Sequence, residues 1–320
     1  MKKIPNRQVH LDFHTSEMID QVGSKFSAEE FADTLKNANV EAVTLFTRCH
    51  HGNLYYDSTK YPERIHPHLK VKDMYREQAK ECRKKGIKVY LYTTICWDIQ
   101  VAAEHPEWVA IDDYARISRR ETGNIFEDPG FHVDLCINSP YREFCKEQIA
   151  DALENCPVDG VLVDASFVVE CCCPRCRKSM LEKHLNPADP QDRKKHAWQI
   201  YYDFVREMTD YLHEIDSDYD IFFNKGHVGA QDIPVRDCFD YVAVESQPAN
   251  CGYMDFPVSA RYLRTWGVPV VGMTGRFLTG WGDNNSYRNQ AALEYESFSA
   301  LSYGGLCNIG DQPVSYTHLR

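Results

Sequence analysis

Short apolar runs recur along the chain, separated by longer stretches with a helical period. The most complete run, Gly160–Val163, ends on Asp164, and such a run is typical of a strand with both faces covered. Seven further strands are predicted at residues 8–13, 42–46, 87–95, 219–224, 241–244, 269–273 and 306–309. Helices are predicted at residues 27–37, 73–85, 140–155, 197–215, 258–266 and 290–303.

Eight strands that alternate with helices predict a (β/α)8 TIM barrel, with residues 1–312 as one domain. Residues 104–135 are expected to be mostly loop, and residues 165–195 a long insertion. A closing helix is expected after the eighth strand, but residues 313–320 are short and polar. We therefore expect the barrel to be truncated after this strand, with a tail that is truncated or non-native.

The composition limits the possible binding partners and the cellular compartment of the protein. The net charge of −11 argues against nucleic acid and anionic membranes as partners. No apolar run approaches the roughly 20 residues of a membrane span, and no signal peptide pattern follows the N-terminus. Thirteen cysteines in such a chain indicate reduced thiols or metal ligands, which predicts a cytoplasmic protein.

Polar residues follow nearly every predicted strand, at the end that forms the catalytic face of such barrels. Asp164 follows the fourth strand and Glu245 follows the sixth. Two carboxyl groups on one rim are the arrangement that glycoside hydrolysis requires. The alternative for either residue is a plain ion pair, for example with Arg276.

Histidines and aromatic residues surround this predicted rim. Period two places His10, Asp12 and His14 on one face of the first strand. They could bind sugar hydroxyls, hold a hydrolytic metal, or simply hydrogen bond within the barrel mouth. The candidate substrate-binding residues are His10, Asp12, His14, His50, His51, Trp97, Asn224, Arg276 and Trp281.

A cysteine motif follows the fourth strand. Cys171, Cys173 and Cys176 have the spacing of thiolate ligands around one metal, and Cys136 is the best candidate for the fourth. Four thiolates form a closed, structural zinc site, so this site is expected to hold the loop without catalysing a reaction. Ordinary reduced thiols are the alternative. No organic cofactor is expected.

These residues also carry a family resemblance, over residues 7–312. The motifs HLDFHT, CHHGNLYY, HPEW, CINSPYRE, CxCPxC, TGRF with Trp281, and IGDQ together resemble hypothetical glycoside hydrolase barrels. Those barrels are related to alpha-L-fucosidases and zinc-containing beta-galactosidases, and often carry a further domain of trimerisation type. The resemblance implies a carbohydrate substrate and leaves open a homo-oligomer for a full-length protein.

The resemblance also implies residue roles. The fucosidase nucleophile is an aspartate after the fourth strand, which corresponds to Asp164, whereas the carry-over of the acid/base to Glu245 is weak. His50 and His51 resemble a sugar-contacting His-His-Asp-Gly-Phe stretch, with its aspartate missing. The galactosidases join a cysteine before a helix to a Cys-x-Cys-x-x-Cys loop, as here. The galactosidases also have an Asn-Glu pair after the fourth strand and a glutamate after the seventh, and this sequence has neither. The catalytic residues of the galactosidases are therefore not expected here.

Together these observations predict an exo-acting, retaining glycoside hydrolase with Asp164 and Glu245 as the catalytic pair. A metal-dependent, amidohydrolase-like barrel is one alternative, suggested by the first-strand histidines and Asp311. Against it, the fourth strand supplies no lysine and His227 lies beyond the end of the fifth. A barrel that binds carbohydrate without catalysis is the other alternative.

Overall fold

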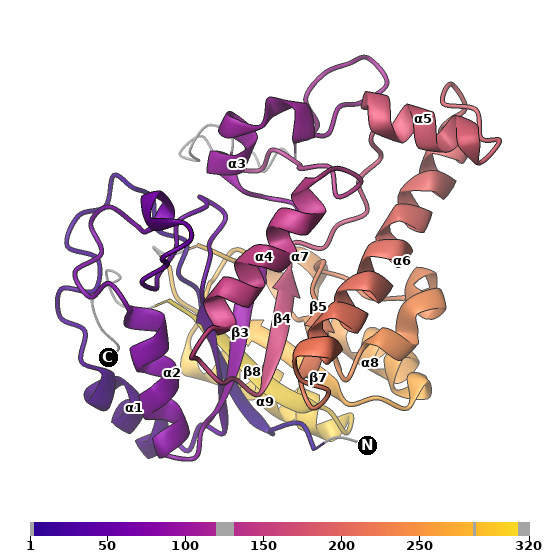
Figure 1. Cartoon of the computed structure of the whole chain (residues 1–320). Coiled ribbons are helices and arrows are strands. Elements are labelled where there is room, and N and C mark those ends of the chain that lie inside the picture. The colour runs from indigo at the N-terminus through magenta and orange to yellow at the C-terminus, as the bar shows by residue number, and fades with distance from the viewer. Residues whose placement is uncertain (1–2, 120–130, 284–285, 313–320) are drawn as a thin grey trace.

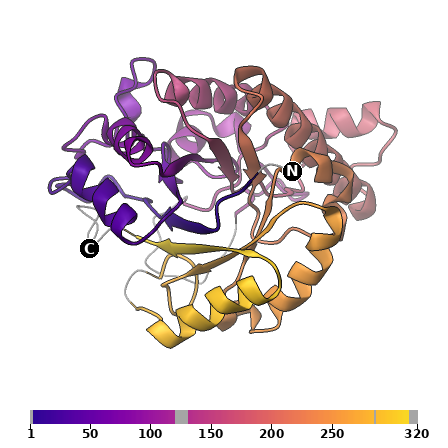
Figure 2. The same ribbon diagram turned by 90° about the horizontal axis from the view of Figure 1, so that it is seen from below.

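The computed structural model describes residues 3–119, 131–283 and 286–312. Within these ranges, eight strands form one sheet in the order β5-β4-β3-β2-β1-β8-β7-β6, and helices surround it (Figures 1 and 2). The strands are β1 (Arg7–Leu11), β2 (Ala42–Phe46), β3 (Lys88–Thr94), β4 (Gly160–Asp164), β5 (Asp220–Phe223), β6 (Val242–Glu245), β7 (Val270–Gly275) and β8 (Leu306–Asp311). All seven strand-to-strand ladders are parallel, which confirms the predicted (β/α)8 barrel.

The ring is nearly closed at the seam between β5 and β6. Asp240, just before β6, donates its backbone N–H to the carbonyl of Ile221 at 3.1 Å. Its carboxylate accepts the N–H of Ile221 at 2.9 Å. One residue therefore joins the two strands near their beginning.

The helices agree with the sequence pattern at most positions. They are α1 (Ala28–Asn37), α2 (Met74–Lys84), α3 (Ile99–Glu104), α4 (Tyr141–Leu153), α5 (Pro174–Glu182), α6 (Pro190–Ile215), α7 (Pro248–Cys251), α8 (Asp255–Leu263) and α9 (Gln290–Ser302). Short 3-10 turns are η1 (Pro62–Arg64), η2 (Pro106–Trp108), η3 (Ala230–Cys238) and η4 (Arg264–Trp266). Ser27 caps the start of α1, because its hydroxyl accepts the N–H of Glu30 at 3.4 Å.

The expected insertion at residues 165–195 is more helical than predicted. It contains α5, and α6 begins at Pro190 instead of residue 197. The cause is local, because Asp189 caps α6 by accepting the N–H of Gln191 at 2.8 Å and proline suits the first helical position. In Figure 1, α3 and α5 both lie in the upper part of the view, and α6 runs down along the barrel.

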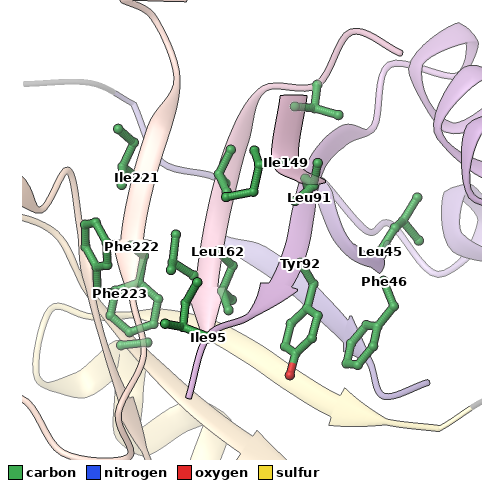
Figure 3. Close-up of a cluster of buried hydrophobic side chains, with 14 of the residues drawn as sticks. Leu45, Phe46, Leu91, Tyr92, Ile95, Ile149, Leu162, Ile221, Phe222 and Phe223 are labelled. Atoms are coloured by element: carbon green, nitrogen blue, oxygen red, sulfur yellow. The ribbon is translucent and has the colours of Figure 1, made fainter. Parts of the chain in front are cut away.

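The core lies between the strands and the surrounding helices. All five residues of β2 and all four of β5 are buried, and Figure 3 shows Leu162, Phe222 and Phe223 among the buried hydrophobic side chains. Gly160 permits the close approach of β4 to β5, because a Cβ there would lie 2.2 Å from the carbonyl oxygen of Asp220. Within the described residues, no helix combines the length and hydropathy needed to cross a membrane. The prediction for residues 313–320 concerns a segment outside the described ranges.

A buried ion pair fixes the loops after β2 and β3. Arg48 donates to Asp98 at 2.8 Å, and neither side chain is exposed. Arg64 lies 3.7 Å from the same carboxylate, which also caps α3 by accepting the N–H of Val101 at 2.9 Å. Asp98 therefore serves the framework of the barrel mouth and is not available to a substrate.

We predict that Asp98→Ala lowers the free energy of unfolding by about 3–5 kcal/mol, because it leaves the Arg48 charge buried without its partner. Asp237→Ala is the matched control, since its pair with Arg206 is about half exposed (66% and 48%), and we expect it to cost less than about 1 kcal/mol. Urea denaturation of both variants measures the difference. Equal losses of unfolding free energy in the two variants would mean that the buried ion pair stabilises the protein no more than an exposed one.

Candidate active site

Asp164 and Glu245 meet at the barrel mouth through one side chain. Asp164 ends β4, Glu245 ends β6, and Asn224 directly follows β5 between them. The Nδ2 atom of Asn224 donates to Asp164 Oδ1 and to Glu245 Oε1, at 2.7 Å each. The two carboxylate oxygens are therefore no more than twice 2.7 Å, or about 5.4 Å, apart.

A tyrosine that the sequence analysis missed holds the other side of Asp164. The hydroxyl of Tyr92, in β3, donates to Asp164 Oδ2 at 2.5 Å. The ring of Phe46 stacks on that of Tyr92 at 3.6 Å, and the two are side by side in Figure 3. The signal was available, because period two places Tyr92 on the same face of β3 as Thr94.

The two carboxyl groups have raised proton affinities. Burial raises the pKa of Asp164, although hydrogen bonds from Tyr92 and Asn224 act against this rise. Burial, opposed by the Asn224 hydrogen bond and reinforced by the charge of Asp164, raises the pKa of Glu245 to about 7. Glu245 can therefore carry a proton near neutral pH, as a general acid must.

Three of the predicted histidines line the same mouth. His10 Nε2 lies 3.2 Å from Asp12 Oδ1, and the ring of His14 stacks on that of His50 at 3.9 Å. His50 Nε2 lies 3.9 Å from Asp164 Oδ2. Burial, together with the neighbouring histidines, lowers the pKa of both His14 and His50 well below its usual value. These two rings are therefore neutral at physiological pH.

The predicted aromatic residues also lie at the mouth. The ring of Trp97 makes an edge contact with His50 at 4.9 Å, and its Nε1 donates to Asp134 at 3.0 Å. The ring of Trp281 lies 5.6 Å from that of His10. A Cβ on Gly310 would come within 2.1 Å of the Trp281 ring, so glycine is required there. His51 lies against Phe131, with ring centres 4.9 Å apart.

Arg276 does not pair with either carboxylate of the site. It donates to Asp311 at 2.6 Å, and 42% of its side chain is exposed. The alternative of an ion pair between Arg276 and Asp164 or Glu245 is therefore wrong. Arg276 stays a prediction as a substrate contact at the rim.

The histidines and the aspartate of the first-strand region are not close enough together to form a metal site like that of the cysteines. Among the described residues, the group of three or more His, Cys, Asp or Glu whose ligand atoms all lie within 4.8 Å of one another is Cys136, Cys171, Cys173 and Cys176. His14 Nε2 is 3.9 Å from Asp12, but His10, Asp12 and His14 together do not form such a group. The amidohydrolase-like alternative gains no support from this geometry.

The four cysteines could hold a metal ion. All four are buried, and the sulfur of Cys136 lies 3.9 Å from that of Cys173 and 3.5 Å from that of Cys176. The four sulfur atoms all lie within 4.8 Å of one another. The N–H of Cys173 donates to the sulfur of Cys171 at 3.4 Å, and the amide of Asn138 donates to that of Cys176 at 3.5 Å. Such N–H groups stabilise thiolates, and four thiolates fit a tetrahedral ion.

Comparison with known proteins now adds to this geometry. Residues 27–165 match the model of the family described as hypothetical glycosyl hydrolase 6. This match confirms the resemblance predicted from the sequence. No curated protein matches the chain.

The solved structure of alpha-L-fucosidase isoenzyme 2 from Paenibacillus thiaminolyticus is similar over 98% of this chain, with 32% identity and a TM-score of 0.89. The chain spans about half of that protein, 48% of its length. The PgaB (BpsB) glycoside hydrolase domain from Bordetella bronchiseptica matches with 16% identity and a TM-score of 0.65, over 98% of this chain and 95% of that domain. A beta-galactosidase from Marinomonas ef1 matches with 13% identity and a TM-score of 0.64, over 95% and 54%. These last two likenesses show the fold alone.

The raised pKa of Glu245 predicts a pH-dependent stability. Folding raises this pKa from 4.5 to about 7, so the folded state binds the proton more tightly and the protein loses stability as pH rises through that window. Glu245→Gln removes the ionisation but keeps an acceptor for Asn224. We expect this variant to match the wild type near pH 4 and to exceed it at pH 8 by up to about 3 kcal/mol.

Urea denaturation at a series of pH values measures this difference. Glu214→Gln, an exposed substitution on α6, is the control and should show no such trend. A constant difference between Glu245→Gln and the wild type across the pH range would contradict a raised pKa.

Proposed function

We propose that this protein is an exo-acting, retaining glycoside hydrolase, more similar to fucosidases than to galactosidases. The main support is that Asn224 donates a hydrogen bond to each carboxylate, which keeps an oxygen of Asp164 within about 5.4 Å of an oxygen of Glu245. Carboxyl groups about 5–5.5 Å apart are typical of retention, whereas inversion requires about 6.5–9.5 Å to admit a water molecule. The bridge supports the shorter separation.

In this proposal each carboxyl group has one role. Asp164 attacks the anomeric carbon while Glu245 gives its proton to the leaving oxygen, so the glycosidic bond breaks and a glycosyl ester forms on Asp164. Glu245, now ionised, takes a proton from water, and the resulting hydroxide equivalent attacks the anomeric carbon. The sugar leaves with its configuration retained, and both carboxyl groups return to their starting state.

The surroundings support a neutral sugar as the substrate. Neutral histidines such as His14 and His50 can give and accept directional hydrogen bonds to hydroxyl groups. Trp97 and Trp281 supply apolar surfaces at the same mouth. The likeness to an alpha-L-fucosidase at 32% identity supports a terminal 6-deoxyhexose, and hence exo-action.

We expect Asp164→Asn to lower cleavage of aryl glycosides at least 10³-fold without loss of folding, because the amide cannot form the glycosyl ester. A panel of aryl alpha-L-fucosides and beta-D-galactosides measures turnover, and circular dichroism checks the fold. Asp203→Asn on α6, where the carboxylate is 45% exposed, is the matched control and should keep full activity.

Two outcomes would overturn this assignment. Unimpaired turnover by Asp164→Asn would remove Asp164 as the nucleophile. Saturable sugar binding by the wild type, without turnover of any glycoside in the panel, would favour the carbohydrate-binding barrel.

We also propose that the cysteine cluster holds a structural zinc ion. Cys136, Cys171, Cys173 and Cys176 supply four sulfur donors, and hydrogen bonds from the other three thiols lower the pKa of Cys173. A bound zinc would tie the segment before α4 to the start of α5 and the loop before it. All thirteen cysteines are free, which supports a reducing compartment and our proposal of a cytoplasmic protein.

Cys173→Ser should lower the zinc content from about one ion per chain towards zero and reduce the melting temperature by several degrees, because structural zinc contributes folding free energy. Cys251→Ser is the control, since Cys251 is exposed and outside the cluster. Elemental analysis and thermal unfolding measure both effects. A wild-type protein free of zinc, with a stable Cys173→Ser variant, would leave the four residues as ordinary thiols.

A further inference from the structure

We propose that Asn224 is a positioning residue that sets the separation of Asp164 and Glu245 and holds Glu245 in place. The inference rests on the glycosidase function proposed above, but its test does not require turnover. The sequence analysis placed Asn224 among the substrate contacts. Its hydrogen bonds give it a different task.

Both donors of the Asn224 amide are already used. One amide nitrogen carries two hydrogens, and Nδ2 makes two hydrogen bonds of 2.7 Å, one to each carboxylate. The Oδ1 atom accepts the N–H of Gly226 at 3.2 Å, which turns the nitrogen towards the carboxylates. A sugar hydroxyl could obtain a donor from Asn224 only by displacing one of the catalytic carboxylates.

The backbone of Asn224 is equally constrained. Its N–H donates to the carbonyl of Val163 at 2.9 Å, and its carbonyl accepts the N–H of Ser166 at 2.9 Å. Both partners flank Asp164 in the chain. The amide is therefore carried on a backbone anchored directly to the segment that bears the proposed nucleophile.

The two carboxylates depend on Asn224 to different degrees. Asp164 also receives the Tyr92 hydroxyl at 2.5 Å. Among the described residues, Asn224 supplies the one side-chain hydrogen bond that Glu245 receives. The titratable groups that face the pair are His10 of β1, Asp12 just after β1, His50, Tyr92 of β3 and Cys251 of α7. Loss of Asn224 should therefore affect Glu245 more than Asp164.

The test is a carbon-13 NMR titration of protein labelled at its Glu and Asp carboxyl carbons, with Glu245→Gln used to assign the Glu245 signal. In the wild type we expect a Glu245 midpoint of about 7. Asn224→Ala should raise it by about one pH unit, since a hydrogen bond to a charged group favours the ionised form by roughly that much. Tyr92→Phe, which removes a donor from Asp164 alone, should leave the Glu245 midpoint nearly unchanged.

An exposed substitution, Asn37→Ala at the end of α1, should leave both midpoints unchanged. The inference fails if Asn224→Ala leaves the Glu245 midpoint where it is, or if Tyr92→Phe moves it as far. Failure of the proposed function looks different: no glycoside is cleaved, yet the midpoint still moves in Asn224→Ala. If glycosides are cleaved and the midpoint does not move, the function stands and the positioning role is wrong.

The unmutated protein provides a second measurement in case Asn224→Ala does not fold. The NMR chemical shifts of both side-chain amide protons of Asn224 should change with pH, with the same midpoint as the Glu245 carboxyl signal. This change should disappear in Glu245→Gln. Amide protons that do not respond to the titration would overturn the inference.

Discussion

The Asn224 amide can hold Asp164 and Glu245 together only because β4, β5 and β6 end side by side at one end of the barrel. The seam between β5 and β6 is where this matters most. Near the start of these strands, Asp240 joins them through Ile221. At their far end, the hydrogen bond from Asn224 to Glu245 spans the same seam. The proposed catalytic pair thus lies at the seam where side-chain contacts replace backbone pairing between β5 and β6. Polar side chains can gather there without breaking hydrogen bonds between paired strands.

The charge balance of the mouth follows from where the cations lie. Arg48 and Arg64 pair with the buried Asp98, and Arg276 pairs with Asp311. His14 and His50 are neutral because burial lowers the pKa of both rings. Among the described residues, no arginine or lysine pairs with Asp164, and its charge adds to burial in raising the pKa of Glu245. A carboxyl group with a pKa of about 7 beside a second carboxyl group is the kind of pair on which the proposed acid–base roles depend.

The sequence was sufficient for the parts of this arrangement that depend on chain periodicity. Apolar runs located the strands, and because parallel strands expose their ends at one face, Asp164 and Glu245 could be expected to meet. The spacing of the cysteines likewise indicated their cluster. Period two put Tyr92 on the same face of β3 as Thr94, but its hydrogen bond to Asp164 depends on which side chain of that face lies beside the carboxylate. The partner of Arg276 and the role of Asn224 depend on side-chain geometry across strands, which no local pattern records.

The cysteine cluster and the barrel mouth are joined through Trp97. The backbone of Leu135, next to Cys136, donates to the carbonyl of Cys96 at 2.8 Å, and Asp134 accepts the Trp97 indole N–H at 3.0 Å. On its other side, Trp97 packs against Phe167, which lies between Asp164 and the cysteine loop, with ring centres 4.7 Å apart. Both chain segments that enter the cluster therefore contact the tryptophan that borders His50. A metal bound by the four cysteines would restrain these two segments together, and through them the wall of the proposed sugar site.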